Sequence, residues 1–188
     1  MSLMLLGILN AQAAGGGGGA YDLLETTTLG SSASSVTFSS LGAYSDYAHL
    51  QIRYVVRGAE ASSSKDHFIN LNGDTGSNYS YHTLRVNLPN VVSQGYGNQS
   101  NYFIGAVAAD DVGTGIFSPG IVDVLDFASS SKNTTLKTLG GNVSSNNTVY
   151  LSSGGYFSTN AITSIAFSLN SGDYLTGTRF SLYGIKGA

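Results

Sequence analysis

Three histidines are the side chains of this sequence that suit acid–base chemistry near neutral pH: His49, His67 and His82. Asp66 precedes His67, but an Asp–His pair acts in catalysis only where a nucleophile meets the imidazole in space. Serines are abundant, yet the Gly-x-Ser-x-Gly turn of hydrolases does not occur, and the chain has no cysteine. We therefore expect no catalytic residues and no enzyme, and we interpret the histidines as ordinary surface or partly buried side chains.

Two pairs of aspartates offer the oxygen ligands that Ca²⁺ prefers, Asp110-Asp111 and Asp123 with Asp126. Neither lies in an EF-hand-like loop, and the first pair has the composition of a turn. Gly95–Gly97 and Gly113–Gly115 resemble phosphate-binding loops, but no helix start or Gly-Lys-Ser/Thr follows either one. The sequence therefore predicts no metal site and no cofactor.

Tyrosine is the more informative residue, because the chain has twelve tyrosines and no tryptophan. Six of them lie in or beside polar segments: Tyr44, Tyr47, Tyr79, Tyr81, Tyr96 and Tyr102. Exposed tyrosine among Asn and Ser forms adaptable contact surface for sugar or protein, whereas the alternative is that tyrosine caps the edges of a sandwich. We take Tyr44, Tyr47, Tyr79 and Tyr96 as candidate surface contacts; the missing tryptophan weakens the case for a lectin.

The first 25 residues differ in composition from the rest of the chain. An apolar stretch, which ends at Asn10, is followed by Ala-Gln-Ala, five glycines and an acidic segment. We interpret this region as an extended arm that binds a partner. Its predicted contact residues are Leu3, Met4, Leu5, Leu6, Ile8 and Leu9, and its predicted hinge is Gly15, Gly16, Gly17, Gly18 and Gly19.

Two other interpretations of the opening segment stay open. Leu3–Leu9 with Ala11–Ala13 resembles a short secretion signal, although no Lys or Arg precedes the apolar run. The segment could also be an ordinary core strand. A membrane span is excluded here, because it needs about 20 consecutive apolar residues.

The body of the chain shows short β-rich runs between turn clusters and almost no helical periodicity. The clearest run is His49–Arg57, in which Leu50, Ile52 and Tyr54 alternate with polar residues. The predicted strands are Val36–Phe38, His49–Arg57, Phe68–Leu71, His82–Leu88, Asn101–Val107, Ile121–Phe127, Thr134–Leu139, Thr148–Leu151, Ile162–Leu169 and Arg179–Ile185. Leu88–Gln99 and Ser171–Gly177 are rich in turn residues and are predicted to be loops.

About ten short strands predict two packed antiparallel sheets, because each sheet has one apolar face to bury. We expect an all-β, jelly-roll-like sandwich over residues 26–188, preceded by the arm over residues 1–25. Only 10% of the residues are charged, the net charge is −3, and no basic run exists. Binding to nucleic acid therefore lacks the cations that neutralise phosphate, and we expect neither a nucleic-acid nor a membrane partner.

Three segments resemble virion proteins of tailed bacteriophages, particularly those of aquatic and cyanobacterial hosts. They are Leu5–Ala13 with the glycine run and Tyr21–Glu25, then Tyr47–Arg53, and finally Gly177–Lys186. Together these segments cover about a quarter of the chain. The resemblance implies a capsid decoration (cement) protein or a tail or fibre component, often trimeric, and no catalytic residues.

We therefore expect a viral structural protein that stabilises a phage head through its arm. Its expected partners are the major capsid protein and neighbouring copies of itself, as a homo-trimer on the capsid surface. The alternative is a tail or fibre component that binds a host surface glycan through its tyrosine-rich loops. A secreted β-sandwich adhesin or hydrolase is a third possibility that the sequence leaves open.

Overall fold

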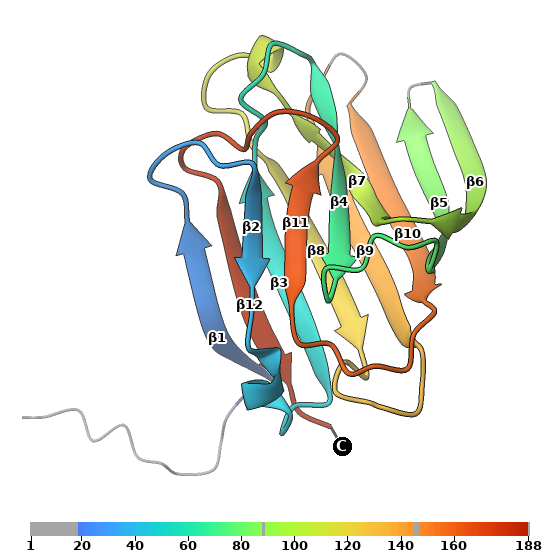
Figure 1. Ribbon diagram of the computed structural model, residues 1–188. Coiled ribbons are helices and arrows are strands. Elements are labelled where there is room, and N and C mark those ends of the chain that lie inside the picture. Colours follow the sequence, from blue (N-terminus) through green and yellow to red (C-terminus); the bar gives the residue numbers. More distant parts are fainter. Residues whose placement is uncertain (1–18, 88, 145–146, 188) are drawn as a thin grey trace, which may run out of the picture.

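The computed structural model describes residues 19–87, 89–144 and 147–187, and in these the chain folds as two antiparallel β-sheets packed as a sandwich (Figure 1). The predicted all-β fold is thus confirmed. The predicted arm residues 1–18 lie outside the described residues.

The larger sheet has eight strands within the described ranges. In spatial order they are β1 (Tyr21–Thr28), β12 (Arg179–Ile185), β3 (His49–Val56), β8 (Ser118–Leu125), β9 (Thr134–Asn142), β10 (Thr148–Tyr156), β5 (Tyr79–Asn87) and β6 (Asn90–Gln99). Every neighbouring pair is antiparallel. In Figure 1 the β5–β6 end of this sheet stands away from the rest of the sandwich.

The smaller sheet has four strands in the order β2 (Ser35–Phe38), β11 (Ile165–Leu169), β4 (Ser64–Leu71) and β7 (Tyr102–Ala108). The chain crosses between the sheets at eight connections of the described ranges: β1–β2, β2–β3, β3–β4, β4–β5, β6–β7, β7–β8, β10–β11 and β11–β12. Two short 3₁₀ turns, η1 (Leu41–Tyr44) and η2 (Asp110–Val112), lie in the connections.

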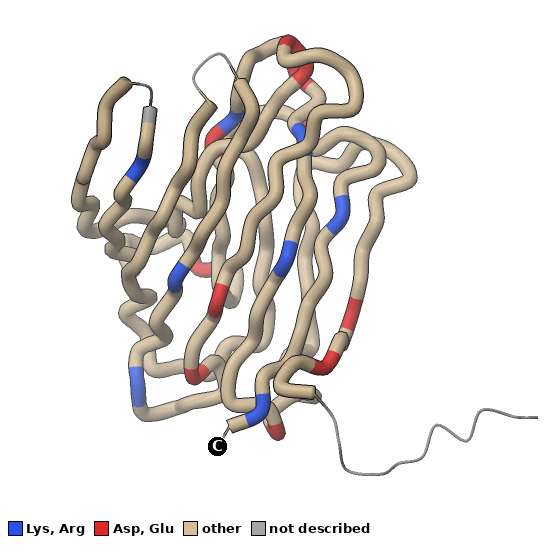
Figure 2. Tube along the Cα trace, turned by 180° about the vertical axis from the view of Figure 1, so that it is seen from behind, with Lys and Arg blue, Asp and Glu red and all other residues tan. Residues whose placement is uncertain are grey.

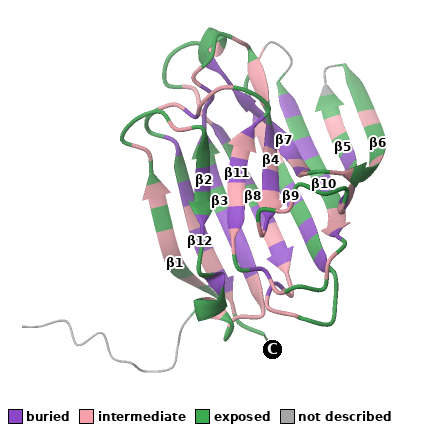
Figure 3. Ribbon diagram, viewed as in Figure 1, coloured by how far each residue is buried: buried purple, intermediate pink, exposed green. Residues whose placement is uncertain are grey.

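Strict alternation of side chains builds the core between the sheets. Along β4 the odd-numbered positions from His67 to Leu71 are buried, and β11 is buried at Ile165, Phe167 and Leu169 in the same way (Figure 3). Phe167 of the small sheet packs on Phe180 of the large sheet, with ring centroids 4.7 Å apart. These facing aromatic rings hold the two layers together.

Two strands differ from the sequence expectation. Leu88–Gln99 was expected to be a loop, but Asn90–Gln99 forms β6, because it pairs with β5 from Asn87↔Asn90 to Tyr79↔Gln99. Tyr21–Glu25 was expected to belong to the arm, but it forms most of β1 and pairs with β12 around a bulge at Leu24. Both are edge strands of the large sheet, so a partner on one side alone supplies their hydrogen bonds.

Candidate interaction surface

Half of the outer face of the large sheet is apolar and exposed. Its exposed apolar side chains are Val55 on β3, Ile121 on β8, Leu139 on β9, Val149 and Leu151 on β10, Leu84 and Val86 on β5, and Val91 on β6. We call this set the apolar face. Single exposed apolar side chains are common on soluble proteins, whereas a contiguous patch on the order of several hundred Å² marks an interaction site.

Cross-strand register makes the apolar face continuous. Ile121 lies directly opposite Leu139, Leu139 opposite Leu151, and Leu151 opposite Leu84, so four leucine or isoleucine side chains form one row across four strands. Directly opposed side chains on one face of a sheet have Cβ atoms about 5 Å apart, which leaves no room for water between them. The row is therefore a single apolar surface rather than four separate contacts.

A second row lies beside the first and contains a hollow. Val149 faces Val86 on one side and Gly141 on the other, and Val86 faces Val91. Because Gly141 has no side chain, a groove of about 510 Å³ opens beside Pro119 and Val149, and its exposed lining is almost entirely apolar. The apolar face thus contains a groove that can accept an apolar side chain of a partner.

The other half of the same face is polar, and Arg53, Gln51 and Asp123 contact one another or neighbouring rings there. The Arg53 guanidinium lies over the rings of Tyr21 and Tyr183, at 5.2 and 4.7 Å from their centroids. Arg53 Nε also donates to Gln51 Oε1 at 2.8 Å, and Gln51 Nε2 donates to Asp123 Oδ1 at 2.8 Å. Figure 2 shows this face of the molecule with only scattered charged residues.

The predicted arm contacts and four of the five hinge glycines lie outside the described residues. These are Leu3, Met4, Leu5, Leu6, Ile8, Leu9, Gly15, Gly16, Gly17 and Gly18. Gly19 is described and is exposed two residues before β1 begins at Tyr21. The arm therefore remains a sequence prediction, and the structure shows only the strand to which it is joined.

The four candidate tyrosines have different surroundings. Tyr79 is fully buried against Tyr156, and its hydroxyl accepts from the Leu71 amide at 2.9 Å, so its prediction as a surface contact is wrong. Burial raises the pKa of Tyr79 to about 12. Tyr44, Tyr47 and Tyr96 are partly buried against the core.

Tyr47 has a structural contact at the end of β1. Its hydroxyl donates to Asp22 Oδ2 at 3.0 Å, and Lys186 Nζ lies 3.0 Å from the same oxygen. The hydrogen bonds from Lys186 and from Tyr47 lower the pKa of Asp22. This cluster joins the start of β1 to Tyr47 and to Lys186 near the C-terminus. It lies next to the residues that connect β1 to the predicted arm.

The Asp–His pair noted in the sequence does not come together in the structure. Asp66 and His67 point to opposite faces of β4, so they make no dyad. His67 is enclosed by Tyr54, Phe167 and other aromatic rings, and burial lowers its pKa to about 3. Within the described ranges, no three His, Asp or Glu side chains come together as a metal site would require.

The sequence analysis missed the apolar face, although a signal for it exists. In Thr148–Leu151 the outward residues Val149 and Leu151 are as apolar as the inward Tyr150. A strand that alternates apolar with apolar has two faces to cover, and in β5 the outward residues Leu84 and Val86 are likewise apolar.

No protein-family model matches this chain, and no curated protein or solved structure matches it either. The helices in the part of the chain that the structure describes are single short turns, and none has the length or apolarity needed to cross a bilayer.

Proposed function

We propose that this protein is a viral structural protein of the capsid decoration type, which assembles with copies of itself through the apolar face. The observation that carries the proposal is that face: eight exposed apolar side chains in two adjacent rows on one sheet. The resemblance of both chain ends to phage virion proteins supports the particle as the setting. The major capsid protein is the proposed second partner.

A second copy of this chain is the occupant that fits the apolar face best. Its exposed area, on the order of several hundred Å², approaches the roughly 800 Å² per partner of a standard stable interface. The two rows carry no charge, so two copies meet there without like-charge repulsion. At the rim, Asp123 lies directly opposite Lys137. A second copy therefore brings one negative and one positive side chain to the same rim, and each can face the opposite charge.

The proposed assembly is closed and small. A heterologous contact that does not close on itself produces filaments, whereas a cyclic trimer, in which different parts of the apolar face meet around the three-fold axis, covers that face in every subunit. Covering it would also leave β1 and the attached arm free to reach the shell. In this account the arm residues Leu3–Leu9 bind the major capsid protein and the apolar face binds neighbouring copies.

The experiment that tests the function measures copies per particle by quantitative mass spectrometry of purified phage. We expect Leu139→Asp to lower the occupancy at least about tenfold, because a charge would be buried among leucines. Leu23→Asp is the matched control, since Leu23 is also an exposed leucine of the large sheet but lies on β1, outside the apolar face. Equal occupancy of the two variants, or absence of the wild-type protein from particles, overturns the proposal.

The arm is tested separately by deleting residues 2–19. The deletion ends before β1, so the sheet keeps all its strands. We expect the deleted protein to assemble with itself but to be lost from capsids, and unchanged occupancy would rule out the arm as the shell contact.

A tail or fibre position is the second candidate, favoured by the partly exposed Tyr96 beside a pocket on the opposite side of β5 and β6. Electron microscopy of particles labelled with an antibody against the body distinguishes the two positions. Label on the shell supports decoration, and label confined to the tail supports the second candidate.

A further inference from the structure

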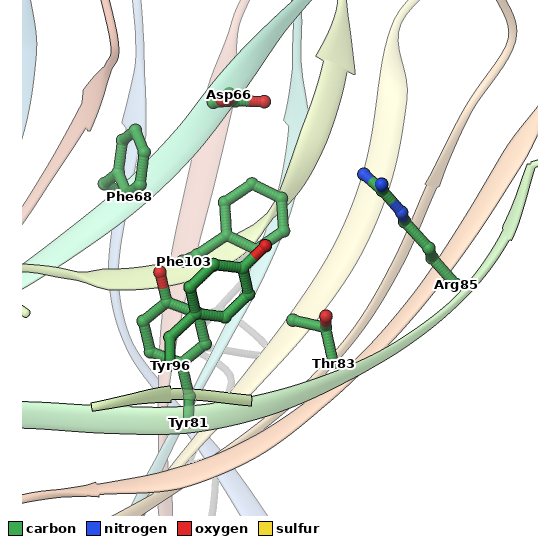
Figure 4. A pocket seen from close by; sticks show the side chains of 7 residues that line it. All are labelled: Asp66, Phe68, Tyr81, Thr83, Arg85, Tyr96 and Phe103. Carbon is green, nitrogen blue, oxygen red and sulfur yellow. The ribbon is translucent and has the colours of Figure 1, made fainter. Parts of the chain in front are cut away.

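A pocket of about 160 Å³ lies where the β5–β6 end of the large sheet curves around the edge of the small sheet. Seven residues line it: Asp66 and Phe68 on β4, Tyr81, Thr83 and Arg85 on β5, Tyr96 on β6, and Phe103 on β7 (Figure 4). Its volume is below the roughly 300 to 1,000 Å³ of sites that enclose drug-sized ligands, so it admits a ligand about one ring in size.

One wall of the pocket is a row of aromatic rings. Tyr81 is in the middle, with its centroid 5.0 Å from Tyr96 and 6.3 Å from Phe103, and the interplanar angles are only 34° and 28°. Tyr81 is buried, while Tyr96 and Phe103 are partly exposed. Phe68 meets Phe103 edge-on at 5.8 Å. The row therefore presents aromatic surface on which the apolar face of a ligand ring can stack.

Two residues of the pocket carry opposite charges, Asp66 and Arg85. Figure 4 shows the Asp66 carboxylate and the Arg85 guanidinium on two sides of the opening, pointing into it. The Asp66 backbone is fixed by Asn170, which donates its amide to the Asp66 carbonyl at 2.9 Å. No hydrogen bond or ion pair joins the Asp66 carboxylate to another residue in the described ranges.

Electrostatics around the two groups agrees with this geometry. The protein around Asp66 raises the pKa of its carboxyl by removing water, and the positive charge of Arg85 acts in the opposite direction. Arg85 lies directly opposite Tyr150 of β10, and the two side chains share a hydrogen bond. Because one negative and one positive group share the pocket, a ligand with no net charge suits it best.

The geometry points to a binding site for one neutral sugar ring of a glycan. The apolar C–H face of a pyranose stacks on an aromatic wall, and its hydroxyls both donate to a carboxylate and accept from a guanidinium. A zwitterionic amino acid also matches the two charges. The sugar ring is favoured because its C–H face stacks on the aromatic wall while its hydroxyls reach both charged groups.

The pocket and the apolar face are separate surfaces of the same strand. Along β5, Tyr81, Thr83 and Arg85 point into the pocket, whereas Leu84 and Val86 point outward to the apolar face. Self-assembly over the apolar face therefore leaves the pocket open. The sugar-binding inference does not depend on the proposed assembly, and either one can fail alone.

The test is an NMR titration of the ¹⁵N-labelled full-length chain with methyl glycosides of neutral hexoses and N-acetylhexosamines. Methyl glucuronide and leucine are included as charged and zwitterionic comparisons. We expect at least one neutral glycoside to shift the amides of Tyr81, Thr83 and Tyr96. Shifts elsewhere, no shift with any neutral glycoside, or shifts at the pocket with leucine alone overturn the inference.

Variants distinguish stacking and hydrogen bonding from a loss of folding. We expect Tyr96→Ala to weaken binding about tenfold, while Tyr96→Phe, which keeps the ring, retains it. Tyr21→Ala is the matched control, because Tyr21 is another tyrosine on an edge strand of the same sheet.

Asp66→Asn removes the strong acceptor and is expected to weaken binding about tenfold, whereas Asp111→Asn in the η2 turn leaves it unchanged. Well-dispersed amide spectra establish that each variant is folded. Equal weakening by a pocket variant and its control contradicts the inference.

Discussion

His67 places a titratable ring in the middle of the aromatic core. Tyr54, Tyr174 and Phe180 surround it with centroids 4.9 to 6.0 Å away, and neither ring nitrogen has a hydrogen-bond partner in the described part of the chain. Burial therefore lowers its pKa to about 3, so that the folded protein keeps His67 neutral. An imidazole held in this way contributes packing rather than catalysis.

The pKa of His67 predicts how stability depends on pH. Lowering the pKa of a base on folding means that the unfolded chain binds the proton first. The free energy of unfolding therefore falls by up to about 1.4 kcal/mol per pH unit as pH decreases below about 6.5. Urea unfolding at pH 7.0 and pH 5.0 measures this fall. We expect His67→Phe to have a smaller fall than wild type, by about 2 kcal/mol over that interval.

His82→Gln is the control for this comparison, because His82 is exposed on the outer face of β5. The free energy of unfolding of the His82→Gln variant should decrease with falling pH as much as that of the wild type. A His67→Phe variant with an unchanged pH dependence would show that the buried ring is not the origin of the effect.

At the scale of elements, the pairing of β10 with β5 determines where the β5–β6 hairpin lies. Gly154 is opposite Tyr81 in this pair, and a Cβ atom at Gly154 would come within 2.0 Å of the Ser80 carbonyl oxygen. The next residue, Gly155, has only an ordinary contact, with Thr134 O at 3.5 Å. The two glycines therefore have very different tolerance for a side chain, although they are adjacent in sequence.

We expect Gly154→Ala to lower the free energy of unfolding by at least about 2 kcal/mol, because the backbones of β10 and β5 must separate. Gly155→Ala is expected to change it by less than about 1 kcal/mol. Thermal or urea unfolding measures both variants. The explanation is wrong if the two substitutions have equal effects.

The two edge strands show what the sequence could and could not predict. Strands with an apolar inner face follow from alternation because burial imposes a period of two: the predicted runs His49–Arg57 and Ile162–Leu169 contain β3 and β11. The β6 segment Asn90–Gln99 has glycines and polar residues at most positions, and it is a strand because β5 pairs with it. A hairpin strand that buries few apolar side chains shows no period of two in its sequence, even though it pairs with its neighbour.

The candidate sites were predictable only in part, for the same reason. Tyr96 was selected from composition, but its partners Asp66, Tyr81 and Phe103 come from three other strands. The row from Ile121 to Leu84 likewise depends on register across four strands. The alternation within one strand predicts which face of the sheet a residue occupies. Which residues of different strands become neighbours depends on the strand order and register of the sheet.

At the scale of the whole molecule, the core and the exposed apolar surface lie on different faces of the sheets. The small sheet and the inner face of the large sheet form the core, and the outer face of the large sheet carries the exposed apolar rows. A folded subunit with this arrangement remains incompletely buried until another surface covers those rows. We regard that uncovered face as the property of the fold that most favours a role in an assembly.

The mass of the full chain in solution, measured by multi-angle light scattering, tests this claim most directly. The account predicts an oligomer for the wild type and for Leu23→Asp, with a trimer of 19.4 kDa chains as the expected state, and a folded monomer for Leu139→Asp. A wild-type monomer at concentrations of about 100 μM, well above those at which specific interfaces assemble, would contradict it. An oligomer that survives Leu139→Asp unchanged would contradict it equally.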